Sequence, residues 1–153
     1  MIIRDLFTEK GVQETVDRIN KLTPTTKAEW GKMSVDQMLA HCNVAYEMVF
    51  IDGKYKKPGA FGKFMVKLFA KKAVVGPKPY PISGRTAPDF IINGARDFEV
   101  EKNKLISYIM MVNKLGPDHF DNRESHSMGK LSTNEWNTLF SKHLDHHLMQ
   151  FNV

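Results

Sequence analysis

The sequence has little of several features that define other protein classes. It has a single cysteine in 153 residues, so no internal disulfide can form. No apolar stretch approaches the ~20 residues that a membrane-spanning helix needs. The N-terminus, Met1 to Asp5, lacks the basic start and long apolar run of a signal peptide. We therefore expect a cytoplasmic protein with no disulfide framework and no membrane span.

Acidic side chains are missing from one segment. Between Gly53 and Pro88 there is no Asp or Glu, whereas Arg85 and eight lysines occur there: Lys54, Lys56, Lys57, Lys63, Lys67, Lys71, Lys72 and Lys78. The other 13 basic residues are set against 17 acidic ones, so the net charge of +5 comes from this segment alone. A basic segment suits nucleic acid, anionic lipid or an anionic ligand. Binding of nucleic acid is disfavoured, because the rest of the chain is acidic. Few aromatic residues that could stack on bases lie among these lysines, only Tyr55 and Tyr80 outside the predicted helix.

What is present is the composition of one ordinary globular domain. Hydrophobic residues make up 42% and charged residues 25%, and the length is sufficient to bury a core. We expect a single domain over residues 1–153.

Helical patterns dominate the chain. A first helix is predicted before Pro24, because Val12, Val16 and Ile19 recur at helical spacing. Two helices begin with a capping box, Ser34 to Gln37 and Ser132 to Glu135, in which two side chains satisfy free N–H groups at the helix start. The first of these ends at Asp52-Gly53.

Two further helices are predicted in the middle of the chain. One spans Phe61–Val75, with apolar residues on one side and Lys63, Lys67 and Lys71 on the other. The other spans Asp97–Leu115, closed by Gly116-Pro117. The segment 76–94 contains four prolines and is predicted as a long loop of the kind that forms lids.

The predicted fold is all-α. We expect an antiparallel four-helix bundle with an extra helix and a long Pro-rich loop. Only the run Asp89 to Asn93 resembles a strand. Trp30, Trp136 and the aromatic residues of the predicted helix 61–75 are interpreted as core.

The last helix places two histidines on its apolar stripe. With about 100° per residue and Phe140 as the centre, His143 and His147 lie within about 60° of it, whereas His146 lies roughly 120° away. Two imidazoles four residues apart can bind one metal ion. The alternative is a pair of core histidines hydrogen bonded to backbone or to a carboxylate.

A third ligand has to come from another part of the chain. His41 is the natural candidate, because it lies about 100° from the centre of its helix's apolar face, where a neighbouring helix packs. His119 and His126, in the loop before the last helix, are the alternatives. Three His ligands leave a coordination position open, as in catalytic sites.

These histidines lie in segments that resemble a known superfamily. Trp30 to Cys42, Met128 to Trp136 and Lys142 to Phe151 resemble the DinB-like (YfiT-like) superfamily of proposed metalloenzymes and, more narrowly, a domain-of-unknown-function branch of it. The resemblance implies a four-helix bundle whose divalent metal is bound by His41, His143 and His147. It also implies chemistry with low-molecular-weight thiols and a homodimer. The chain departs from the pattern at Ser125 to Met128, where the superfamily has a phrase like His-Pro-Phe.

The chemistry expected from this site is that of a metal with open positions. Such an ion, which could be Zn, Ni or Fe, lowers the pKa of a bound water or thiol, so the expected function is a thiol-dependent S-transferase or a hydrolase with a small-molecule substrate. The alternative is a non-catalytic metal- or ligand-binding, stress-associated protein.

Other reactive residues are given lesser roles. Glu47 and Asp145 are placed on the solvent side of their helices by phase, so neither is nominated as a general base. Gln37 is a candidate hydrogen-bond partner for His41 or simply a cap, and Cys42 is interpreted as a buried, inert thiol. Lys63, Lys67 and Lys71 are either a solvated face or a device that attracts an anionic substrate.

Overall fold

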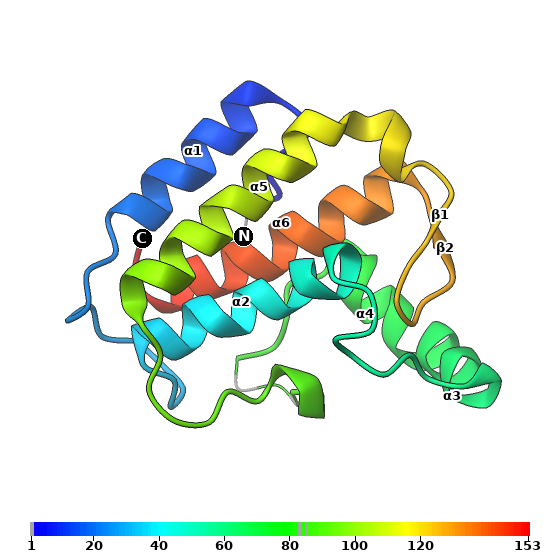
Figure 1. Ribbon diagram of the computed structural model, residues 1–153, viewed down its shortest axis with the longest axis horizontal. Helices are drawn as coiled ribbons and strands as arrows, with labels where there is room; N and C mark the ends of the chain where they lie inside the picture. Colours follow the sequence, from blue (N-terminus) through cyan, green and yellow to red (C-terminus); the bar gives the residue numbers. More distant parts are fainter. Residues whose placement is uncertain (1, 83, 85) are drawn as a thin grey trace.

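A computed structural model describes residues 2–82, 84 and 86–153 and shows a mostly helical chain (Figure 1). The long helices are α1 (Glu9–Asn20), α2 (Val35–Phe50), α5 (Phe98–Phe120) and α6 (Thr133–Gln150). In Figure 1 α2 and α5 run in the same direction and α1 and α6 in the opposite direction. The expected antiparallel order therefore does not hold for the α2–α5 pair, because the long connection 51–97 returns the chain to the end where α2 began.

The two predicted capping boxes start α2 and α6. Gln37 accepts a hydrogen bond from the Ser34 backbone N–H at 3.2 Å, and Glu135 accepts one from Ser132 at 3.0 Å. Every α2 residue from Met38 to Glu47 is buried, so α2 is the central helix. On α6 the predicted stripe is confirmed, since Trp136, Phe140, His147 and the adjoining Phe151 are buried and His143 is half-buried.

α1 and α5 also match their predicted patterns. Thr8 caps α1 by accepting a hydrogen bond from Gly11 N, and Asp97 caps α5 through Val100 N. The α5 stripe, Phe98, Leu105, Ile109 and Val112, is fully directed into the core. The regular helix ends at Gly116, whose φ of 75° is in the left-handed region that glycine favours, and one further turn follows to Phe120.

The small sheet is not where the sequence suggested it. Asp89 to Asn93 is no strand; its first residues lie in a 3₁₀ turn, η2 (Pro88–Phe90), within the long loop. Instead, β1 (Arg123–Glu124) pairs antiparallel with β2 (Lys130–Leu131) in a short hairpin before α6. Two-residue strands carry no alternating pattern, which is why the sequence did not reveal them.

The predicted helix 61–75 forms, but it faces the other way. It consists of α3 (Ala60–Met65), a π-helical turn η1 (Val66–Ala70) and α4 (Lys71–Val75), here called the arm. Its apolar face is exposed, so the interpretation of these residues as core is wrong: Phe61, Phe64, Met65, Leu68 and Phe69. The side that packs on the protein carries Val66 and Val74. Trp136 is buried as expected, and Trp30 is half-buried.

Glu47 and Asp145 are buried, contrary to the expectation that they face solvent. Glu47 is 3% exposed and is bound by Lys54 at 2.6 Å and Lys104 at 3.2 Å. Asp145 is 4% exposed and is bound by Arg4 and Arg18. Helical phase assigned both to the outer face, but α5 and the loop after α2 cover Glu47, and the N-terminal segment and α1 cover Asp145.

Candidate metal centre

The structure brings the three predicted histidines together. His41 projects from the middle of α2, and His143 and His147 project from successive turns of α6, which packs against α2. One ring nitrogen from each lies within 4.8 Å of the others. His41 and His147 are buried and His143 is half-buried. Three imidazoles at this spacing can bind one metal ion.

The outer nitrogens of two rings are held by hydrogen bonds. His41 Nδ1 lies 2.8 Å from the Phe90 carbonyl oxygen, and His147 Nδ1 lies 2.8 Å from Gln150 Oε1. Because carbonyl and amide oxygens only accept, both Nδ1 atoms carry the proton and both Nε2 atoms present a lone pair. Gln150 is itself fixed, since its amide donates to the Trp30 carbonyl at 2.6 Å. This is the outer hydrogen bonding that orients metal-binding histidines in proteins.

The inner nitrogens fit a cation. His41 Nε2 and His143 Nε2 are 2.9 Å apart, and the His41 lone pair points into this gap. A cation shared with His147 would satisfy the lone pairs of all three rings, whereas a proton on His143 Nε2 would satisfy only that of His41. Burial lowers the pKa of His41, His143 and His147, reaching about 3 for His147, so the rings are neutral at physiological pH. Neutral imidazole is the form that binds metal.

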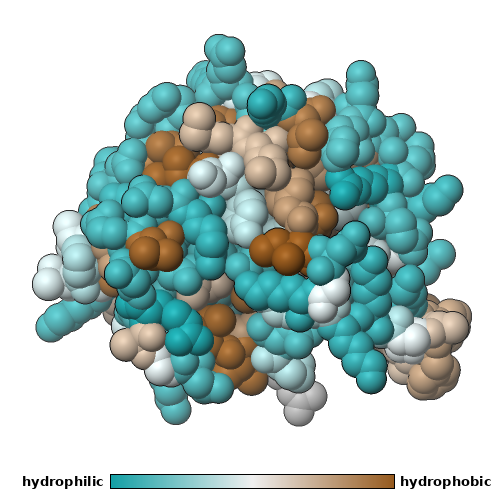
Figure 2. Space-filling view, in the orientation of Figure 1, coloured by the Kyte–Doolittle hydropathy of each residue, from teal (hydrophilic) through white to brown (hydrophobic). Residues whose placement is uncertain are grey.

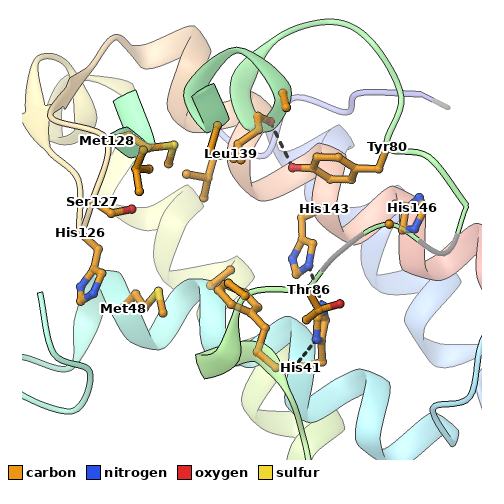
Figure 3. A pocket seen from close by; sticks show the side chains of 18 of the residues that line it. His41, Met48, Tyr80, Thr86, His126, Ser127, Met128, Leu139, His143 and His146 are labelled. Atoms are coloured by element: carbon orange, nitrogen blue, oxygen red, sulfur yellow. Dashed lines mark hydrogen bonds between the residues drawn. The ribbon is translucent and has the colours of Figure 1, made fainter. Parts of the chain in front are cut away.

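A cavity of about 580 Å³ opens beside the three histidines (Figure 3). Most of its lining is apolar: α2 supplies Ala45, Met48 and Val49, and the arm supplies Val66, Ala70 and Val74. Figure 3 shows His41, His143, Tyr80 and His146 toward one end and His126, Ser127 and Met128 toward the other. Its described lining includes no carboxylate. The lining is therefore mainly apolar, with polar side chains toward both ends.

Tyr80 and Lys142 attach the long loop and the arm to α6. Lys142 is fully buried; its ammonium donates to the carbonyls of Ala73 at 2.7 Å and Gly76 at 2.8 Å and lies 4.5 Å from the centre of the Tyr80 ring. The Tyr80 hydroxyl donates to the Val74 carbonyl. Burial raises the pKa of Tyr80 to about 12, so its hydroxyl stays protonated. Sequence patterns gave no sign of these roles, because the acceptors are backbone carbonyls.

The remaining candidate residues are separated from the three histidines. His119 is exposed and hydrogen bonded to Arg123, whereas His126 lines the far end of the cavity. Gln37 caps α2 and donates to the Gly94 carbonyl, so it is not a partner of His41. The glutamine that holds a histidine of this group is Gln150 on α6. Cys42 is fully buried, as expected, and burial raises the pKa of its thiol. His146, which helical phase placed at the edge of the stripe or in solvent, lines the cavity next to Tyr80.

Comparison with known proteins assigns a family to the chain. No curated protein and no solved structure matches it significantly. A family model does match, over residues 3–153, which is nearly the whole chain. The chain therefore belongs to the family described as "Protein of unknown function (DUF1569)".

Proposed function

We propose that the protein is a divalent-metal-dependent enzyme whose metal is bound by His41, His143 and His147. The observation that supports this most strongly is the pair of fixed Nδ1 atoms, because they leave the Nε2 lone pairs of His41 and His147 available in a group of three ring nitrogens within 4.8 Å of one another. Nitrogen ligands of this kind suit Zn, Ni or Fe. On this proposal the chain is a member of the DinB-like superfamily with its four-helix arrangement, formed by α1, α2, α5 and α6.

The favoured reaction is thiol-dependent S-transfer. His41, His143 and His147 would hold the metal with coordination positions left open, and the metal would supply Lewis acidity that lowers the pKa of a low-molecular-weight thiol. The apolar walls formed by Ala45, Val49, Val66 and Val74 exclude water and hold the electrophilic substrate. The transfer requires no carboxylate base, in keeping with the described lining of the cavity.

Hydrolysis is the second candidate, and His146 is the observation that favours it. Its ring lines the cavity, and the centroids of the His146 and His147 rings are 5.0 Å apart. His146 does not belong to the group of three histidines proposed to bind the metal. Burial lowers the pKa of His146, so its imidazole is neutral and able to accept a proton from an attacking water. In the S-transfer reaction the same ring would accept the thiol proton.

Metal analysis of three purified proteins tests the metal site. We expect wild type to retain about one equivalent of metal, His147→Ala to lose it, and the neighbouring control His146→Ala to retain it. Added zinc or nickel should raise the melting temperature of wild type and of His146→Ala only. Loss of metal from all three proteins, with no thermal shift in wild type, would refute the metalloenzyme proposal.

Ligand binding then separates the reaction classes. The metal-loaded protein is titrated with several low-molecular-weight thiols by calorimetry. Binding that disappears in His147→Ala supports S-transfer. Absence of thiol binding together with metal-dependent cleavage of an activated ester supports hydrolysis, and absence of both leaves a non-catalytic metal-binding protein.

A further inference from the structure

The arm presents an apolar face that the rest of the described chain leaves uncovered. Phe61 is 77% exposed, Phe69 68%, and Phe64 and Leu68 59% each. In Figure 1 α3 projects from the side of the helices, and Figure 2 shows a hydrophobic patch at the same place, at the lower right. Exposed apolar residues gathered on one helix face mark an interaction surface.

This orientation is held by contacts on the opposite side of the arm. Val66 and Val74 pack against the core and line the cavity. Lys71 forms an ion pair with Glu135 at 2.9 Å, and Lys63 forms a longer one with Glu124 at 3.6 Å. Lys63 and Lys71 therefore attach the arm to the protein and are not simply solvated, so the exposed phenylalanines cannot turn inward without breaking these contacts.

The arm and the segments next to it carry lysines that no described carboxylate neutralises, although Glu124 and Glu135 lie beside Lys63 and Lys71. Lys56, Lys67, Lys72 and Lys78 are exposed, and no carboxylate in the described chain lies within ion-pair distance of them. No acidic residue occurs between Gly53 and Pro88. Exposed phenylalanines flanked by uncompensated lysines are the pattern of a helix that binds anionic lipid headgroups and buries its apolar side chains at the interface.

We propose that the arm docks this protein on the surface of an anionic phospholipid bilayer. The apolar face would enter the boundary between headgroups and acyl chains, to a depth of about 5–10 Å. The association would be peripheral, since no helix in the described part of the chain has the length and apolar character required to cross a bilayer.

A second copy of the chain fits this face less well. Two-fold symmetry would place the two arms and their uncompensated lysines against each other, and like charges opposed across an interface oppose association. A bilayer containing phosphatidylserine or phosphatidylglycerol supplies the opposite charge. A bilayer on the outer side of the arm would also lie close to the cavity, because the inner side of the same helix forms the cavity wall and a helix is about 10 Å across.

Vesicle sedimentation tests the proposal. Wild type is mixed with vesicles of phosphatidylcholine alone or with about one third phosphatidylserine. We expect binding only to the anionic vesicles, and much weaker binding at about 0.5 M salt than at about 0.1 M. Phe64→Ser/Phe69→Ser should weaken the binding tenfold or more, and Lys67→Gln/Lys72→Gln about tenfold. The matched control Lys27→Gln/Lys32→Gln removes the same charge from exposed lysines outside the arm and should change it less than about twofold.

Several results would overturn the proposal. One is equal binding to neutral and anionic vesicles; another is equal weakening by the two lysine double variants. A wild type that binds no vesicle and is dimeric by light scattering, with a monomeric Phe64→Ser/Phe69→Ser variant, would assign the face to a second copy. If that variant does not fold, as judged by its melting temperature, the lysine variants and the salt dependence of wild type decide the question.

Discussion

The cavity has two walls of different construction. α2 and α6 form one wall from buried and half-buried residues, and His41, His147 and Trp136 are among the buried ones. The arm forms the opposite wall, and none of its residues from Ala60 to Val75 is buried. The groups able to do chemistry are therefore fixed by the core of the fold, while the opposite wall is attached by a few side chains. Substitutions in the two walls should have very different costs.

The largest contrast is expected between two phenylalanines. Phe140 on α6 is 1% exposed and stacks on Tyr46 at 5.0 Å between ring centroids, whereas Phe69 on the arm lies mostly in solvent. Phe140→Ala should lower the free energy of unfolding by about 3–5 kcal/mol because it leaves a cavity. Phe69→Ala should change it by less than about 0.5 kcal/mol. Chemical denaturation of both variants gives these values, and similar costs would contradict the exposed position of the arm face.

The second contrast uses Glu47, a buried acid that α2 directs toward α5 and the loop that follows α2. Burial alone raises the pKa of Glu47, but hydrogen bonds from Lys54, Tyr55 and Lys104 outweigh it and lower the pKa below the ordinary 4.5. Because the folded-state pKa is lowered, Glu47 stabilises the fold above the ordinary pKa, and this contribution disappears as the pH falls through the folded-state value. Glu47→Gln should therefore lower the free energy of unfolding by about 2 kcal/mol near pH 7. This is less than the loss expected for a fully buried ion pair, because the two lysines reach solvent.

The pH dependence is the decisive measurement for Glu47. Denaturation curves of wild type and Glu47→Gln should converge as the pH is lowered below 4.5. Asp52→Asn is the control, because Asp52 lies in the same region, is fully exposed and forms only a loose ion pair with Lys57. A constant difference between wild type and Glu47→Gln at every pH would show that packing, and not charge, accounts for the cost.

The third prediction concerns the glutamine behind His147. Gln150→Leu removes the acceptor that fixes His147 Nδ1, and metal affinity should fall about 10- to 100-fold, as for other outer hydrogen-bond partners of metal ligands. Gln37→Leu is the matched control, since Gln37 caps α2 and does not contact His41. Competition titration against a metal-binding dye measures both variants. Equal losses would indicate that helix stability, and not ring orientation, controls affinity.

These contrasts also explain what the sequence could predict. α2 and α6 were found because their capping boxes and stripes are local signals. Helical phase then selected His41, His143 and His147, whose rings lie together in the structure. The partners of the histidines were missed: the Phe90 acceptor is a backbone carbonyl, and Gln150 follows His147 as an ordinary polar residue. Neither position has a residue type that identifies its role.

The arm was misplaced for a different reason. Periodicity identifies an apolar face but does not say whether another part of the chain covers it. In the arm the buried contacts come from the opposite side, through Val66 and Val74, and from lysines whose acidic partners lie far away in sequence. The exposure of Glu47 and Asp145 was mispredicted for the same reason, because the lysine and arginine that bind them come from other elements.

Only a small effect on global stability is expected where the two walls are joined. Burial raises the pKa of Glu135, but hydrogen bonds from Lys71 and the Ser132 backbone outweigh it and lower the pKa, so the carboxylate is charged where it meets the arm. Glu135→Gln keeps the capping box, since glutamine serves that role as well, and removes only the attraction to Lys71. The free energy of unfolding should fall by less than about 1 kcal/mol. Amide hydrogen exchange in residues 60–75 should become roughly several-fold faster, because the arm opens locally more often. Lys71→Gln should have the same effect, and the double variant should add nothing to either single one. Faster exchange in α6 as well would mean that the arm is part of the core's cooperative unit and that the two walls do not differ in the way the structure indicates.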